Sequence, residues 1–303
     1  MRQLVIPPYL REGDLVKIVS PSGVVDRDVV LKAAGKLESS GFRVTIGKNA
    51  FKSDGCFAGT DSERLSDLQE ATSDPDVKAV FCSRGGYGIS RIIDRVDFSA
   101  LKSNPKWYIG FSDITVLHLW LTGVCGIVSL HGEMPLNYFN PKKTAQCYDT
   151  VISALTGRPQ EIKWRCTLND MAEVTGPVTG GNLSLIYSLT GTPAEPDTDG
   201  SILFIEDVGE YYYHLDRMLT SLRLAGKLSN LKALIVGGME KITDGAVPYN
   251  RSIEEIVLDI AGPYGYPVVF DFPAGHIADN RALYIGREAK LTQNGHEASL
   301  LYV

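Results

Sequence analysis

Short apolar runs alternate with amphipathic stretches through the first half of the chain. The runs are rich in β-branched and aromatic residues, which predicts strands, and the stretches between them carry apolar residues at helical spacing. Thr60 and Glu63 have the spacing of a capping box and predict a helix from Thr60 to Ala71. Strands separated by such helices pair in parallel through right-handed crossovers, so the pattern predicts an α/β fold with a doubly wound sheet. The strands expected in this half are 15–19, 42–46, 78–83, 107–110 and 126–130, with a further helix ending near residue 39.

The pattern changes after about residue 155, where a stretch without periodicity begins. Asn294-Gly295 stands between two alternating runs near the C-terminus and predicts a hairpin of 289–292 with 298–301. The other elements expected here are strands at 201–205, 233–236 and 267–270 and a helix at 212–225. We therefore expect an N-terminal α/β domain over 1–155, a linker over 156–175 and a C-terminal α+β domain over 176–303.

Composition narrows the class of protein. The 303 residues carry a net charge of −6 and no block of Lys or Arg, which argues against a nucleic-acid partner. The chain contains no run of about 18 apolar residues, the length that a membrane-spanning helix needs. The first apolar stretch is broken by Pro7 and Pro8 and is not typical of a signal peptide. Five cysteines without close pairing predict free thiols in a reducing compartment, so the cytosol is the expected location. No Cys/His cluster has metal-ligand spacing, and neither a metal nor a cofactor is expected.

Three polar residues stand where apolar strand patterns end: Ser112, Glu206 and His276. A serine hydroxyl becomes a useful nucleophile when a base removes its proton and a carboxylate orients that base. Ser112 is expected at a strand-to-helix turn, where free N–H groups favour developing negative charge. The pattern G-x-S-x-G is incomplete, because its last position is Ile114, and a plain N-cap is the alternative role for Ser112. The three residue types together predict a serine hydrolase.

The residues alone leave the base and the acid open. His276 follows a Pro-Ala-Gly loop and is the first choice, while His131 and His214 remain alternatives. Glu210 is a rival for the role of Glu206. His118 is expected in the core, and His296, beside the Asn-Gly turn, is expected in solvent.

The glycine-rich turn Ser83-Arg84-Gly85-Gly86-Tyr87-Gly88 follows a predicted strand. It lacks the spacing of a nucleotide-binding loop, and its glycines instead allow main chain to approach a substrate and supply an oxyanion donor. Arg84 is a candidate to pair with a substrate carboxylate, with a structural ion pair as the alternative.

Six segments in the same order resemble the serine peptidases that include murein LD-carboxypeptidases and microcin C immunity peptidases, over most of the chain. The resemblance implies a triad of Ser112, His276 and Glu206, with an oxyanion hole formed by the N–H groups of Gly86 and Asp113. It also implies a flavodoxin- or Rossmann-like N-terminal domain, a β-rich C-terminal domain, an active-site cleft between them and a homodimer. The implied substrate is a small peptide, the murein tetrapeptide, cut before its terminal D-Ala in cell-wall recycling. The segments are Gly110–Thr115, Ser83–Gly88, Leu130–Gly132, Gly180–Leu185, Leu203–Asp207 and Gly275-His276 with Asn280.

Two other functions remain open from the sequence. One is an immunity-type peptidase that cleaves a peptidyl- or aminoacyl-nucleotide antibiotic, which needs an aromatic side chain to stack the base; Trp164 and Tyr211 are the candidates. The other is a binding protein without catalysis, in which Gly85 and Gly86 form a clamp for a small peptide or sugar.

Overall fold

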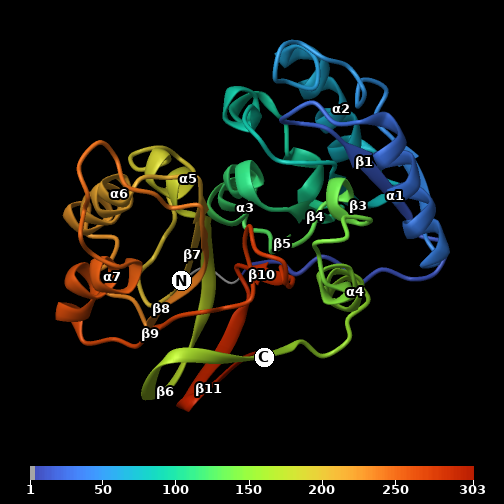
Figure 1. Ribbon diagram of the computed structural model, residues 1–303. Helices are drawn as coiled ribbons and strands as arrows, with labels where there is room; N and C mark the ends of the chain where they lie inside the picture. The colour runs from blue at the N-terminus through green and yellow to red at the C-terminus, as the bar shows by residue number, and fades with distance from the viewer. Residues whose placement is uncertain (1–3) are drawn as a thin grey trace.

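A computed structural model describes the protein over residues 4–303, except for the side chain of Asn169. Figure 1 shows two lobes, one built from the N-terminal half and one from the C-terminal half, each with helices packed on a central sheet. Both sheets consist mainly of parallel strands, which confirms the α/β class. Within residues 4–303, no helix combines the length and the apolarity needed to cross a membrane.

The N-terminal sheet has the strand order β10-β5-β4-β3-β1-β2. The first five strands along the chain pair in parallel, and β10 joins the edge antiparallel to β5. A strand from the end of the chain therefore completes the sheet of the first half. The strands are β1 (Leu15–Val19), β2 (Arg43–Ile46), β3 (Val77–Cys82), β4 (Trp107–Gly110), β5 (Ser129–His131) and β10 (Leu283–Ile285), and the helices are α1 (Arg27–Ser39), α2 (Asp61–Ser73), α3 (Thr115–Trp120) and α4 (Ala145–Leu155).

The capping box predicted at the start of α2 is confirmed. The Glu63 N–H donates to the Thr60 hydroxyl, and the Thr60 N–H donates to the Glu63 carboxylate at 2.9 Å. These two bonds satisfy N–H groups that the first helical turn leaves without partners, so the helix begins where the local sequence directs it.

The C-terminal sheet has the strand order β11-β6-β7-β8-β9, with β6 to β9 parallel and β11 antiparallel at the edge. Each buried apolar cluster includes residues of both lobes, for example Phe111 with Leu183 in one and Leu130 with Phe204 in the other, so the two lobes share their core. The strands are β6 (Glu161–Asn182), β7 (Ile202–Val208), β8 (Ala233–Glu240), β9 (Val268–Val269) and β11 (Glu288–Tyr302), and the helices are α5 (Leu183–Ser188), α6 (Tyr212–Leu224) and α7 (Ile253–Ala261).

Two predictions for this half are wrong. The sequence predicts an irregular linker over 156–175, yet β6 begins at Glu161 and runs unbroken to Asn182. Asn294-Gly295 predicts a hairpin turn, yet it lies inside β11, which pairs along its length with β6. Gly295 has φ 66° and pairs with Asp170, and the register shifts between Gly295 and Glu297, where the extra residues lie in β6, at 166–169. The bulge is therefore in β6, and the Asn-Gly dipeptide stays in a continuous strand beside it.

Candidate active site

Ser112 lies at the carboxyl end of β4, where the chain turns into a short 3-10 helix (Ser112–Ile114) and then α3. Its backbone has φ 64°, a left-handed conformation that costs an L-residue about 1–2 kcal/mol. Phe111, and not Ser112, occupies the cap position of this helix, so the simple N-cap interpretation is not supported. Ser112 is half-buried at the start of this helix, where the first N–H groups have no partner within the helix.

Glu206 and His276 form a hydrogen-bonded pair across 70 residues of chain. The Glu206 carboxylate is fully buried in β7, and its Oε2 lies 2.7 Å from Nδ1 of His276, whose side chain is 21% exposed. A carboxylate on Nδ1 selects the tautomer with the proton there and directs Nε2 outward. The pair therefore has the arrangement of a general base and its orienting acid.

Glycines bring the His276 loop close to Glu206. The register between β7 and β8 shifts at Glu206, opposite Gly237 and Gly238, and the Gly238 N–H donates to the Ala274 carbonyl at 2.9 Å. Gly275 has φ 112°, and a Cβ at this position would lie 2.8 Å from the Glu206 side chain. A larger residue at 275 would push the histidine away from its carboxylate.

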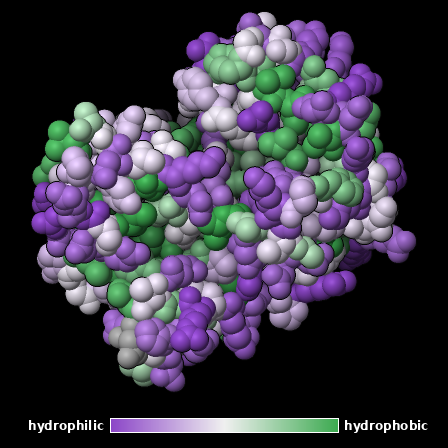
Figure 2. All heavy atoms as spheres, in the orientation of Figure 1, coloured by the Kyte–Doolittle hydropathy of each residue, from purple (hydrophilic) through white to green (hydrophobic). Residues whose placement is uncertain are grey.

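Phe111 connects the pair to Ser112. The Phe111 ring lies 5.0 Å from the His276 ring and 5.6 Å from the His131 ring, centroid to centroid. Ser112 is the next residue in the chain. The contact between Phe111 and His276 therefore links the segment of the N-terminal lobe that carries the nucleophile candidate to the base candidate of the C-terminal lobe. Figure 2 shows a notch in the molecular outline at the top of the view, where these lobes meet.

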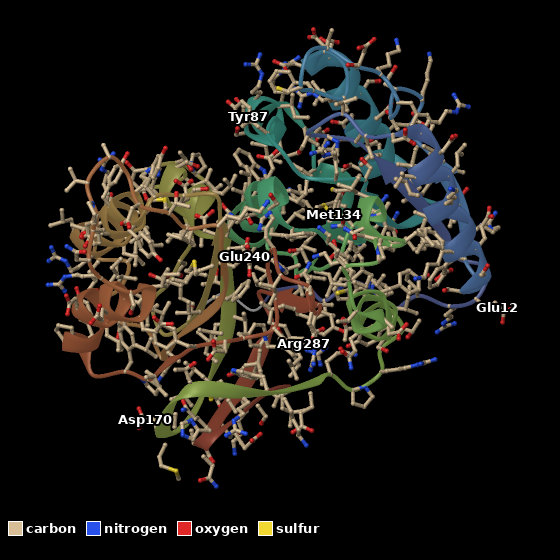
Figure 3. All side chains as sticks on the ribbon, in the orientation of Figure 1. Glu12, Tyr87, Met134, Asp170, Glu240 and Arg287 are labelled. Atoms are coloured by element: carbon tan, nitrogen blue, oxygen red, sulfur yellow. The ribbon has the colours of Figure 1, made fainter. Side chains whose placement is uncertain are left out.

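The glycine-rich turn after β3 lies directly against Ser112. A Cβ on Gly85 would lie 2.8 Å from Cβ and 3.0 Å from Oγ of Ser112. The Gly85 carbonyl accepts from the Gly23 N–H at 3.1 Å, and Gly86, exposed with φ 109°, follows. Tyr87, labelled in Figure 3, extends from this turn at the surface of the N-terminal lobe. The turn thus packs its main chain at Gly85 directly against the serine.

Asp113 and Arg64 hold the far end of this turn. The Asp113 side chain is buried, burial raises its pKa, and its Oδ2 accepts from the Ile89 N–H at 3.0 Å. The buried Arg64 guanidinium donates to the carbonyls of Pro21 (2.6 Å) and Gly88 (2.8 Å). Sequence reasoning missed Arg64, because nothing in an amphipathic helix distinguishes a buried arginine from an exposed one.

Arg84 is placed beside the same turn, where its Nη1 donates to the Val24 carbonyl at 2.7 Å. The side chain is half-buried, and this bond ties the turn to the loop after β1. Its pairing with a substrate carboxylate stays a prediction.

The Gly85 contact carries a testable prediction. Replacing Gly85 by Ala should slow the reaction of Ser112 with a serine-directed phosphonate by about a hundredfold, since the new methyl group would displace the hydroxyl by a fraction of an ångström or more. Gly35→Ala is the matched control, because a Cβ on Gly35, in α1, would meet no atom within 4 Å, and alanine favours a helix. Equal labelling rates in Gly85→Ala and the unchanged protein would contradict the contact.

The other histidines lie in different surroundings. His118 is buried with its ring bonded to the Ser129 hydroxyl and the Gly110 carbonyl, and burial lowers its pKa to about 4. His131 is fully buried between Phe111 and Phe204, and burial lowers its pKa to about 3. Both are neutral at pH 7 and enclosed, which disfavours His131 as the base. Across residues 4–303, no group of three or more His, Cys, Asp or Glu side chains is arranged to hold a metal ion.

A second histidine–carboxylate pair exists on the surface. His214 Nδ1 contacts Glu210 at the start of α6, with the histidine side chain 31% exposed. The His214 ring neighbours Tyr213, whereas the His276 ring neighbours Phe111, the residue before Ser112. The structure therefore favours Glu206 and His276 as the partners of Ser112. As expected, His296 is exposed.

Of the two aromatic residues predicted to be available for stacking a nucleobase, Trp164 is buried and Tyr211 is exposed. Trp164 is buried, donates its indole N–H to the Phe270 carbonyl at 2.9 Å and packs edge-on against Phe272. It therefore offers no free face to a nucleobase. Tyr211 is 46% exposed and stacks on Tyr213 at the surface.

A positive-φ serine at a strand-to-helix turn, a buried carboxylate on Nδ1 of a histidine and a glycine turn against the serine form the kind of site that serine peptidases use. The family models for the N-terminal and C-terminal domains of LD-carboxypeptidases match residues 16–132 and 175–291. The chain belongs to the LD-carboxypeptidase family and is a serine carboxypeptidase.

Individual relatives are similar to this chain over nearly its whole length. A probable murein peptide carboxypeptidase of Bacillus subtilis is 35% identical over 94% of this chain and 91% of its own. A murein tetrapeptide carboxypeptidase of Pseudomonas aeruginosa is 31% identical over 92% and 93%, respectively. The crystal structure of a muramoyltetrapeptide carboxypeptidase from Oxalobacter formigenes has a TM-score of 0.87 at 31% identity, covering 95% of this chain and 98% of that one.

Proposed function

We propose that this protein hydrolyses the amide bond between the L-centre of a diamino acid and the terminal D-Ala of murein tetrapeptides. The observation that carries the proposal is the Glu206–His276 pair, with 2.7 Å between Oε2 and Nδ1. The His276 ring also contacts the ring of Phe111, the residue before Ser112. The substrate class is taken from relatives of 31–35% identity whose names refer to murein peptides.

In the proposed reaction, His276 Nε2 takes the proton of the Ser112 hydroxyl as Oγ attacks the carbonyl carbon of the scissile amide. Glu206 keeps the imidazole in the required tautomer and stabilises its charged form. The N–H groups of Gly86 and Asp113 stabilise the oxyanion. Protonated His276 then gives its proton to the leaving amine, and D-Ala departs.

The acyl-enzyme that remains is an ester of Ser112. His276 takes a proton from a water molecule, which attacks this ester, and returns the proton to Ser112 Oγ as the shortened peptide leaves. We further propose that the enzyme acts in the cytosol as a homodimer, in line with the family resemblance. Its five cysteines are free, which agrees with a reducing compartment.

Mass spectrometry of purified protein with L-Ala-γ-D-Glu-meso-diaminopimelate-D-Ala tests this function, and the expected result is release of D-Ala. The same peptide ending in L-Ala should remain intact, because a pocket shaped for one configuration misplaces the scissile carbonyl of the other. An aminoacyl-adenylate conjugate serves as the second control. Cleavage of that conjugate without cleavage of the tetrapeptide would replace murein hydrolysis by an immunity-type activity.

A further inference from the structure

Glu133 and Lys143 form a buried ion pair beside the loop that carries His276. Glu133 follows β5 in the N-terminal lobe, and Figure 3 labels its neighbour Met134 near the middle of the molecule. The Glu133 side chain is 1% exposed, that of Lys143 is 12% exposed, and Oε2 of Glu133 lies 2.9 Å from Nζ of Lys143. Neither residue belongs to the proposed triad or the proposed oxyanion hole.

Both carboxylate oxygens of Glu133 accept hydrogen bonds or face a cation. Its Oε1 accepts from the side-chain amide of Asn137 at 2.8 Å and from the Met134 N–H at 3.1 Å. Its Oε2 faces Lys143 and also accepts from the side-chain amide of Asn280 at 3.3 Å. A buried charge is tolerated when it is paired and hydrogen-bonded in this way, and removing one partner leaves a costly orphan.

The partners of Glu133 hold the main chain on both sides of His276. Asn280 Oδ1 accepts from the Gly275 N–H at 2.8 Å, immediately before the histidine. Lys143 Nζ donates to the Ile277 carbonyl at 2.7 Å, immediately after it. Two side chains bound to the same carboxylate therefore hold the loop just before and just after the histidine. Gly275 has a positive φ, and glycine restricts the backbone less than other residues, so these bonds limit the movement of the loop.

The same lysine lies near the nucleophile side of the site. Lys143 Nζ is 5.6 Å from the centroid of the Phe111 ring, which contacts His276 and precedes Ser112 in the chain. The network thus joins the N-terminal lobe, which supplies Ser112, to the loop of the C-terminal lobe, which supplies His276.

We propose that Glu133 is a positioning residue for His276, acting through Asn280 and Lys143, which fix the peptide groups on both sides of the histidine. The role rests on the proposed function, in which His276 is the general base. Loss of the carboxylate should let the imidazole move relative to Ser112 and leave the substrate pocket itself in place.

The test compares Glu133→Gln and Lys143→Met with Lys106→Met as the matched control. Lys106 is another buried lysine whose Nζ donates to main-chain carbonyls, those of Ala71 and Asp74, at the opposite end of β4 from Ser112. The measurements are kcat and KM for the tetrapeptide, the rate of phosphonate labelling of Ser112, and Tm.

Both network variants should lower kcat and the labelling rate by about 10- to 100-fold with KM within about twofold, the cost expected of a misplaced catalytic group. The double variant should lose no more than about the larger single loss, because the restraint that Lys143 makes is one of the two that depend on Glu133. Lys106→Met should lower Tm and leave kcat unchanged.

Three outcomes would overturn the role: a fall in Tm with kcat unchanged in Glu133→Gln, a loss expressed only in KM, or fully additive losses in the double variant. If Glu133→Gln does not fold, Asn280→Ala keeps the Glu133–Lys143 pair, removes the side-chain bonds of Asn280 to Glu133 and to Gly275, and is expected to lower kcat in the same way. His276→Ala is measured alongside. Full turnover there would overturn the proposed function itself, whereas an inactive His276→Ala beside an unaffected Glu133→Gln would overturn the positioning role alone.

Discussion

Ser112→Ala is expected to lower kcat for D-Ala release by about 10⁴- to 10⁶-fold, because members of a nucleophile–base–acid unit fail together when one is removed. The residual rate would come from main-chain oxyanion donors and substrate binding, which the substitution leaves in place. Alanine keeps the same left-handed backbone position, so Tm should change little.

The comparison for Ser112→Ala is Ser90→Ala, an exposed serine that follows the glycine-rich turn, which should keep both turnover and phosphonate labelling. Labelling of the unchanged protein should fall on Ser112 alone. Turnover near the unchanged level in Ser112→Ala would rule out the serine as the nucleophile, even if the protein releases D-Ala.

Glu206→Gln is expected to lower kcat by about 10³- to 10⁴-fold with a small effect on KM. The amide has nearly the volume of the carboxylate, so the buried site stays filled, but it no longer stabilises the charged imidazole. Glu206 is fully buried and bonded to Nδ1 of His276, so no solvent replaces the lost charge.

Glu210→Gln is the matched control for Glu206→Gln, because it changes the other glutamate that pairs with a histidine, a half-buried residue just before α6. We expect its kcat within about twofold of the unchanged protein, as for most surface ion pairs. The reverse pattern, with a large loss in Glu210→Gln and none in Glu206→Gln, would assign the acid and base roles to Glu210 and His214.

Local signals in the sequence predict local structure well where the competing interactions are also local. The Thr60–Glu63 capping box and the strand-to-helix turn at Ser112 depend on neighbouring residues, and both are confirmed. The Asn294-Gly295 turn is wrong because pairing with β6, far away in the sequence, outweighs the turn preference, and both residues pair within β11. The same pairing explains why residues from Glu161 onward form a strand although they lack a clear period.

By itself, the sequence determined the α/β class, most of the strands and helices, and three residues able to carry the chemistry of a serine peptidase. It left Glu206 against Glu210, and His276 against His131 and His214, undecided. Only the tertiary structure paired Glu206 with His276, enclosed His131 between two phenylalanines, and set Gly85 against Ser112. Only the structure, too, brought Glu133 to the histidine loop, 147 positions before Asn280. The physical reason is that spacing and periodicity report on neighbours a few residues apart, whereas a carboxylate reaches a distant histidine only when two sheets pack with one particular register.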